Sequence, residues 1–182
     1  MPAKRLVLVL IGCCVVLAGP GRAQELFDSG YYLRTNPDVA AAGIEPRQHF
    51  DQTGWRESRN PSPAFDTGYY LRTNPDVAAV GANPLDHFLA GGWREGRNPS
   101  PLFNLGFYLR VNPDVRRADL NPVLHYMNAG WREGRSPSVF FDTTYYLQHN
   151  PDVVKADINP LAHFVESGWR EGRKPAPWFD TA

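Results

Sequence analysis

The feature that most constrains this chain is an internal repeat of 38 residues. Phe27, Phe65, Phe103 and Phe141 follow one another at this spacing, and Phe179 continues the series. Each of the first four opens a copy that contains Asn-Pro-Asp-Val, then a His followed by an aromatic residue, then Gly-Trp-Arg-Glu. No linker separates the copies, and such self-similarity is typical of repeat architectures. We therefore predict one domain, residues 24–182, with units 27–64, 65–102, 103–140 and 141–178 and a closing segment 179–182.

Each unit is predicted to form about three short helices. In the second unit, Asp66 is placed to cap the first helix, with Phe65 and Tyr70 as a hydrophobic staple across its start. Asn-Pro pairs follow at 74–75 and 83–84. Each pair ends one segment and starts the next, because Pro fits the first helical position and disfavours the α conformation in the residue before it. The Asn of each pair is also placed to cap the helix that follows.

The third helix of each unit is predicted to end at a glycine. Gly92 is placed to adopt the left-handed conformation there, which costs glycine little. No segment alternates apolar and polar residues with a period of two over a useful length, so strands are not expected. Helices this short are unstable alone and must be ordered by packing between units. The predicted fold is all-α: a solenoid-like tandem array of four 38-residue units.

The two ends of the array differ from its middle. Arg47 and Asp51 of the first copy stand where the second copy has Leu85 and Leu89. We interpret them as the polar outer face that a terminal unit requires. At the other end, Phe179 begins a fifth unit. We predict that Phe179, with Trp178 beside it, folds back to fill the place of that unit.

Residues 1–23 have the pattern of a secretory signal peptide. A basic start precedes an apolar run over residues 6–19, and small residues lie at positions −3 and −1 of a cleavage site before Gln24. As an alternative, residues 10–13 resemble a bacterial lipobox, in which Cys13 would carry a lipid anchor. Against this alternative, the apolar run continues beyond Cys13. We expect cleavage before Gln24 and a periplasmic or secreted protein.

The expected mature chain is free of cysteine and mildly acidic. Cleavage removes both cysteines and three basic residues, which leaves 16 basic and 19 acidic residues and a net charge of −3. A disulfide framework and cysteine-bound zinc are then excluded. The acidic balance disfavours nucleic acid as a partner. No later apolar run is long enough to span a bilayer.

The full pattern of one unit resembles a known bacterial tandem repeat. Its segments are Tyr-Tyr-Leu-x-x-Asn-Pro-Asp-Val, Pro-x-x-His-Phe and Gly-Trp-Arg-Glu-Gly-Arg-x-Pro. Similar repeats occur in large secreted calcium-binding RTX-type proteins and beside bacterial glycosyltransferase domains. The resemblance covers essentially all of residues 27–182, and it implies an accessory or surface module rather than a defined reaction. The chain lacks the Gly-Gly-x-Gly-x-Asp nonapeptide, so the resemblance does not imply calcium binding.

One histidine recurs in every unit, as His49, His87, His125 and His163. Stacked helices lie about 8–10 Å apart, whereas zinc needs its ligand nitrogens about 2 Å away, so this row cannot converge on one ion. We interpret each as a partly buried imidazole bonded to a neighbouring backbone group or carboxylate. His149 does not recur and is expected at the surface. We predict no metal and no cofactor.

The Gly-Trp-Arg-Glu segment supplies the candidate ligand-binding residues. A row of indoles and guanidinium groups could hold a repeating anionic glycan through ring faces and bidentate contacts. In the structural interpretation, which we favour, Trp93 fills the space between units while Arg94 and Arg97 pair with Glu95 or Asp76. The candidate residues are Trp55, Arg56, Trp93, Arg94, Trp131, Arg132, Trp169 and Arg170.

The sequence favours a non-enzymatic function. Nearly every polar candidate recurs in equivalent surroundings, whereas an active site needs one asymmetric set of groups, so we expect no catalytic residue. The leading prediction is an exported structural or protein-interaction module at the bacterial cell periphery. The alternative is a binder of cell-surface or extracellular acidic polysaccharide, and a third possibility is an inhibitor or accessory subunit of a larger secreted partner. A glycan binder should expose part of the Trp row, and a structural module should bury it.

Overall fold

The computed structural model describes residues 26–179 and is built of short helices in four similar units. The first unit contains α1 (Ser29–Thr35), α2 (Pro37–Ala42), α3 (Pro46–His49) and the π-helical segment η1 (Phe50–Gly54). Within the described residues there is no strand, only isolated bridges at the three unit junctions. The predicted all-α tandem array is confirmed. The signal peptide, Cys13 and the last three residues of the closing segment lie outside the described residues.

The other three units repeat the same order of elements. The second has α4 (Thr67–Thr73), α5 (Pro75–Ala79), α6 (Pro84–His87) and η2 (Phe88–Gly92). The third has α7 (Leu105–Val111), α8 (Pro113–Arg117), α9 (Pro122–His125) and η3 (Tyr126–Gly130). The fourth has α10 (Thr143–His149), α11 (Pro151–Lys155), α12 (Pro160–His163) and η4 (Phe164–Gly168). Each third helix thus continues directly into a π-helical turn.

The start of each first helix is capped as predicted. The Asp66 carboxylate accepts the backbone N–H of Tyr69 at 2.7 Å, and the rings of Phe65 and Tyr70 lie 5.1 Å apart. The prediction that Asn74 caps α5 is wrong. Its side-chain amide instead donates to the carbonyl of Tyr70 at 2.8 Å, which satisfies the end of α4. Asn83 does cap its helix, accepting the N–H of Leu85 at 3.0 Å.

The glycine at the end of each π-helical turn has a different role from the predicted one. Gly92 is not in the left-handed region, whereas Gly96, four residues later, has φ of 77°. A Cβ atom on Gly92 would lie only 2.2 Å from the hydroxyl oxygen of Tyr70. Gly is therefore required at position 92 because a buried tyrosine hydroxyl packs against its backbone. The predicted left-handed end at Gly92 is wrong for this reason.

Each unit has its own aromatic core and closes on itself. Phe65, Tyr70 and Phe88 are fully buried, and the ring of Phe88 meets that of Tyr70 edge-on at 5.9 Å. The backbone N–H of Asp66 donates to the carbonyl of Pro99 at 2.9 Å, which joins the start of the unit to its end. The next unit begins directly after this closure. Helices of one to two turns are thus held by tertiary contacts, as their length requires.

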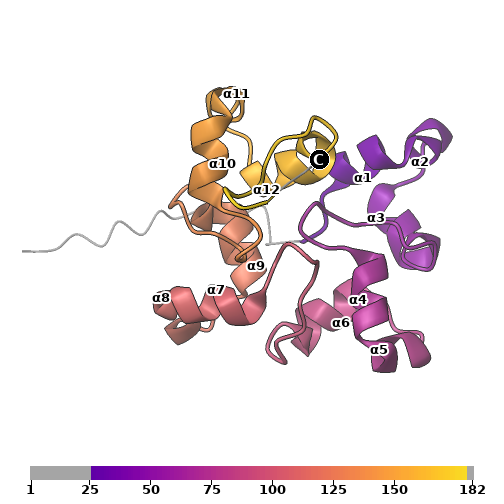
Figure 1. Cartoon of the computed structure of the whole chain (residues 1–182). Coiled ribbons are helices and arrows are strands. Elements are labelled where there is room, and N and C mark those ends of the chain that lie inside the picture. The colour runs from indigo at the N-terminus through magenta and orange to yellow at the C-terminus, as the bar shows by residue number, and fades with distance from the viewer. Residues whose placement is uncertain (1–25, 180–182) are drawn as a thin grey trace, which may run out of the picture.

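The array curls until its last unit reaches its first. Figure 1 shows the four units following one another around a centre, with α12 near α1. The guanidinium of Arg34 on α1 bonds the carboxylate of Glu166 on η4 at 3.0–3.2 Å. The positions equivalent to Glu166 in the first three units hold Gln52, Ala90 and Asn128, none of which is charged. An ion pair of this kind is therefore specific to the fourth unit.

Both predictions about the terminal units need correction. Arg47 and Asp51 do not face an empty side of the first unit. Arg47 pairs with Asp86 of the second unit at 3.0 Å, and Asp51 accepts from Asn83 at 3.2 Å. At the other end, Phe179 is half-buried, but Trp178 remains 64% exposed and does not fold inward.

Within residues 26–179, no helix has both the length and the apolar character needed to cross a membrane.

Candidate functional site

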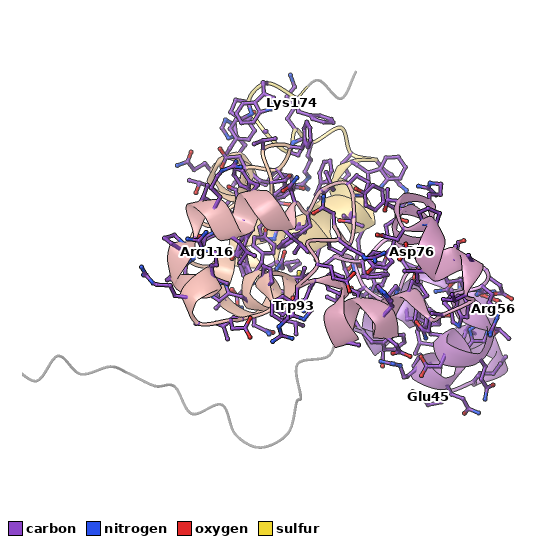
Figure 2. All side chains as sticks on the ribbon, turned by 90° about the horizontal axis from the view of Figure 1, so that it is seen from below. Glu45, Arg56, Asp76, Trp93, Arg116 and Lys174 are labelled. Carbon is purple, nitrogen blue, oxygen red and sulfur yellow. The ribbon has the colours of Figure 1, made fainter. Side chains whose placement is uncertain are left out.

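The four candidate tryptophans fall into two groups. Trp55, Trp93 and Trp131 are only 7%, 8% and 6% exposed, whereas Trp169 is 52% exposed. Trp93 lies toward the middle of the molecule (Figure 2). The local geometry is shared, since the indole N–H of both Trp55 and Trp169 donates to the backbone carbonyl four residues earlier at 3.2 Å. Three of the four indoles are therefore packing residues, and one is open.

The candidate arginines lie over these indoles. The guanidinium carbon is 4.1–4.2 Å from the ring centre in the first three units and 4.8 Å away in the fourth. Arg94 and Arg132 also pair with a carboxylate of the following unit, Asp119 at 2.7 Å and Asp157 at 2.9 Å. Arg56, at the outer edge of the first unit in Figure 2, and Arg170 instead bond a backbone carbonyl of their own unit. All four guanidinium groups remain exposed.

The second arginine of the segment holds the predicted carboxylates. Arg97 bonds Asp76 at 2.8 Å, Glu95 at 2.6 Å and the amide oxygen of Asn74 at 3.2 Å. The predicted pairing with Glu95 and Asp76 is confirmed for Arg97 but not for Arg94, whose partner is Asp119. The side chain of Arg97 is only 23% exposed. It therefore ties the end of the unit to the junction between its first two helices.

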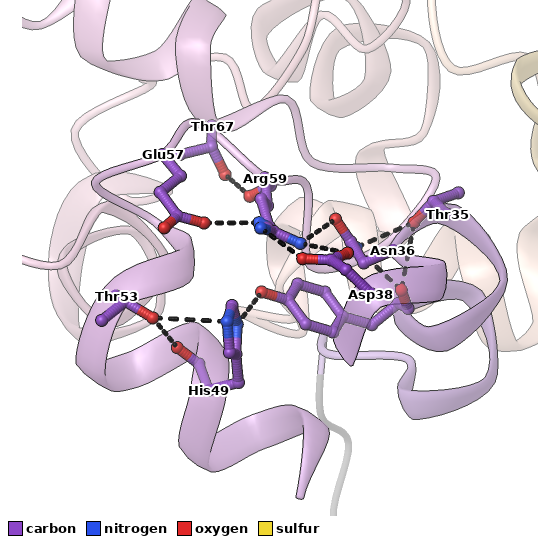
Figure 3. Close-up of polar contacts among 9 residues, drawn as sticks. Thr35, Asn36, Asp38, His49, Thr53, Glu57, Arg59 and Thr67 are labelled. Atoms are coloured by element: carbon purple, nitrogen blue, oxygen red, sulfur yellow. Dashed lines mark hydrogen bonds and ion pairs between the residues drawn. The ribbon is translucent and has the colours of Figure 1, made fainter. Parts of the chain in front are cut away.

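The same contacts recur in every unit, and Figure 3 shows them in the first. There, Arg59 bonds Asp38 through two nitrogens at 2.8 Å and also bonds Glu57 and Asn36. The hydrogen bonds from Arg59 lower the pKa of Asp38 to about 2 and raise that of the guanidinium. The four equivalent pairs are Arg59–Asp38, Arg97–Asp76, Arg135–Asp114 and Arg173–Asp152.

Each recurring histidine bonds a tyrosine of its own unit. The Tyr hydroxyl lies 2.8–3.0 Å from the Nδ1 atom of His49, His87, His125 and His163. The expected half-burial is confirmed, but the partner is a phenol rather than a backbone group or carboxylate. Burial raises the pKa of the paired Tyr70 to about 12 and lowers the pKa of His125 and His163. These pairs fix the first helix of a unit to its third.

His149 is exposed, as expected, and lies against the ring of Tyr145 with centroids 4.0 Å apart. Among residues 26–179, no three His, Cys, Asp or Glu side chains are placed to hold one metal ion.

The open tryptophan lines a pocket that the sequence did not predict. The pocket has a volume of about 240 Å³ and lies where the fourth unit meets the first two unit junctions. Its lining includes Phe164 and Trp169 from the fourth unit, Pro63 and Asp66 from the first junction, and Ser100 and Pro101 from the second. Residues about 40 and 100 positions apart thus share one surface. No local sequence pattern predicts such a site, because it forms only when the curl of the array brings distant units together.

No family model matches this chain, and neither a curated protein nor a solved structure is similar to it.

Proposed function

We propose that this protein is an exported, non-enzymatic helical repeat module that serves a structural or protein-interaction role at the bacterial cell periphery. The observation that carries the proposal is the burial of Trp55, Trp93 and Trp131. These indoles are the strongest candidates for a repeated binding row, but they are packed inside the protein and are not open to a ligand. A row of buried aromatic residues is what a rigid scaffold needs, because helices this short gain order from packing and are unstable alone.

The engagement of the polar side chains supports a non-enzymatic role. Arg97, Asp76 and Glu95 bond one another in an arrangement that recurs in every unit, and His87 bonds Tyr70. Catalysis by acids and bases needs groups in different environments, with separated pKa values and access to a substrate. Here the same groups occupy equivalent, mutually satisfied positions four times. A role in stabilising each unit accounts for this recurring arrangement.

Export and anchoring are tested by the mass of the protein purified from its native host. Cleavage before Gln24 yields a chain of residues 24–182, and electrospray mass spectrometry measures its mass directly. Acylation at Cys13 would give a heavier, lipid-bearing chain that begins at Cys13. An uncleaved chain recovered from the cytoplasm would contradict export altogether.

Binding of an acidic polysaccharide is the second candidate, and one observation favours it. The guanidinium groups of Arg56, Arg94, Arg132 and Arg170 are exposed, one per unit, so a polymer could contact several of them at once. The mature chain is expected to be net acidic, so this attraction would be local and would weaken with salt.

One variant separates the two functions. In the chain with Arg94, Arg132 and Arg170 all changed to Gln, the structural proposal expects a small loss of stability. Among the described residues only Arg94 and Arg132 of these three form ion pairs, and exposed ion pairs contribute about 0–1 kcal/mol each. Thermal unfolding followed by circular dichroism measures this loss. Affinity for an acidic polysaccharide such as alginate is measured on the same samples. If the triple variant is as stable as the original chain but no longer binds alginate, the second candidate is favoured.

A further inference from the structure

The pocket beside Trp169 combines an open aromatic surface with apolar walls. Trp169 is the one indole of the repeated row that no following unit covers among the described residues, and about half of its surface is free. Pro63 and Pro101 come from the first two unit junctions, and Phe164 comes from the fourth unit. A half-exposed indole offers a flat, rigid apolar surface at little cost in conformational entropy. The pocket is thus suited to a ligand with at least one apolar face.

Two polar groups in the same pocket have unused hydrogen-bonding capacity. One carboxylate oxygen of Asp66 caps α4 through the N–H of Tyr69, and the other has no partner among residues 26–179. The hydroxyl of Ser100 also has no partner in that range and is open to solvent, because the only buried polar side-chain atom without a partner there is the Oγ of Ser62. Its counterpart Ser138 accepts the N–H of Phe140 at 3.1 Å. The free carboxylate oxygen of Asp66 can accept a hydrogen bond from a ligand, and the hydroxyl of Ser100 can donate or accept one.

The charge and size of the pocket narrow the ligand further. Its lining carries the negative charge of Asp66 and no basic side chain. An anionic ligand would therefore be repelled, and a ligand with hydroxyl donors would be favoured. The volume of about 240 Å³ lies below the range of roughly 300–1,000 Å³ that holds drug-sized molecules. One ring with a few substituents is the size that fits.

We propose that this pocket binds a single neutral pyranose unit, with the C–H face of the sugar on Trp169 and its hydroxyls bonded to Asp66 and Ser100. A pyranose has both required parts, an apolar face and a rim of hydroxyl groups. This inference goes beyond the proposed function, because it gives the scaffold one ligand site rather than a repeated row. It also differs from acidic polysaccharide binding, since none of the four exposed arginines lines the pocket, although Arg170 is stacked on the ring of Trp169.

Nuclear magnetic resonance of the ¹⁵N-labelled chain tests the proposal. The five tryptophans give five indole N–H signals, and Trp169→Phe and Trp178→Phe identify two of them. Methyl glycosides of glucose, galactose and mannose are titrated separately. At least one of them should shift the Trp169 signal in a saturable way and leave the Trp178 signal in place. Methyl glucuronide, an anionic probe that Asp66 should repel, should bind at least about tenfold more weakly, a difference of about 1.4 kcal/mol. Tetramethylammonium is the competing probe, because a carboxylate beside an indole also attracts a cation.

Three variants and one control connect the binding to the named groups. Because Trp169→Ala removes the indole signal, binding to this variant is read from the backbone N–H signals of Asp66 and Ser100, which should no longer shift. Trp178→Ala, which changes an exposed indole outside the pocket, should leave the titration unchanged. Asp66→Asn should weaken binding several-fold without unfolding the chain, because Asn104 caps the equivalent helix of the third unit naturally. Ser100→Ala should weaken it less.

The proposal is overturned if none of the three glycosides shifts the Trp169 signal, if binding survives Trp169→Ala, or if either charged probe binds equally well. None of these outcomes bears on the scaffold role, which depends on the stability of the unit junctions.

Discussion

The first three unit junctions and the end of the fourth unit share a local sequence but differ in what covers it. Trp93 and Trp169 both follow a glycine, precede Arg-Glu-Gly-Arg and lie beneath an arginine, yet one is 8% exposed and the other 52%. The difference lies in the neighbour. Arg94 and Arg132 pair with a carboxylate of the following unit, and Arg170 does not. Position in the array therefore separates the three buried indoles from the open one, and coverage by the following unit is the hypothesis tested below.

The interiors of the same units do not differ. The Tyr70–His87 and Tyr146–His163 bonds are 3.0 and 2.8 Å long. A Cβ atom on Gly92 or on Gly168 would lie 2.2 Å from the tyrosine hydroxyl in both cases. Each unit thus builds its own core, and only the junction responds to position in the array. The following predictions test this separation, from the largest expected effect to the smallest.

Truncating the covered and the open indole should have different costs. Trp93→Ala removes a buried side chain, and such truncations typically cost about 3–5 kcal/mol of unfolding free energy. Trp169→Ala should cost less than half as much, because about half of the side chain is already in water. Urea unfolding of the two variants measures the difference. Equal losses would mean that the following unit does not account for the burial of Trp93.

A methyl group added at the core glycines should be costly in both regions. Gly92→Ala and Gly168→Ala each place a Cβ against a tyrosine hydroxyl, and forcing extra atoms into a packed core costs about 1–3 kcal/mol. Gly91→Ala is the matched control, because its Cβ would meet nothing closer than 3.7 Å. Thermal unfolding compares the three. If Gly168→Ala leaves the stability unchanged and Gly92→Ala lowers it, the interiors of the two units differ after all.

Acid should destabilise covered and open units alike. Hydrogen bonds from arginine lower the pKa of Asp114 in the third unit and Asp152 in the fourth from 3.8 to about 2. A folded-state pKa below the unfolded value gives stability that is complete above about pH 4 and is lost as the pH falls toward 2. Asp114→Asn and Asp152→Asn should each reduce this acid-dependent loss by a similar amount. Urea unfolding at several pH values measures it, and an acid loss unaffected by either substitution would contradict the assignment.

The contact that joins the first unit to the fourth should contribute least. Arg34→Gln breaks an exposed ion pair with Glu166, a class worth about 0–1 kcal/mol. The loss should shrink as salt is added, because exposed charges are screened. Arg72→Gln is the control, since Arg72 occupies the same position in α4 and has no ion pair among the described residues. A loss that is the same for both variants would remove the ion pair as a contributor to closure.

Local signals predicted the parts of the fold that depend on a few neighbouring residues. The caps at Asp66 and Asn83 and the staple of Phe65 on Tyr70 were predictable because each involves residues at most five positions apart. The roles of Asn74 and Gly92 were not. Asn74 is engaged by Arg97, and Gly92 by the hydroxyl of Tyr70, both more than 20 residues away in sequence. A preference for caps or turns carries no information about such distant contacts.

The same limit applies to the candidate site. The Trp and Arg residues could be named from their repetition, but repetition made all four look equivalent. Only packing separated Trp169 from the three covered indoles, and only the contact of the fourth unit with earlier junctions placed Asp66 and Ser100 beside it.

The sequence by itself determined the number of units, their length and their helical character, because periodicity, caps and prolines act over short distances. The tertiary structure alone decided the curl of the array, the meeting of Arg34 with Glu166 and the pocket at Trp169. These features depend on the small rotation between successive units, which accumulates along the array. That rotation depends on how the surfaces of successive units pack together, so no single segment of the sequence specifies it.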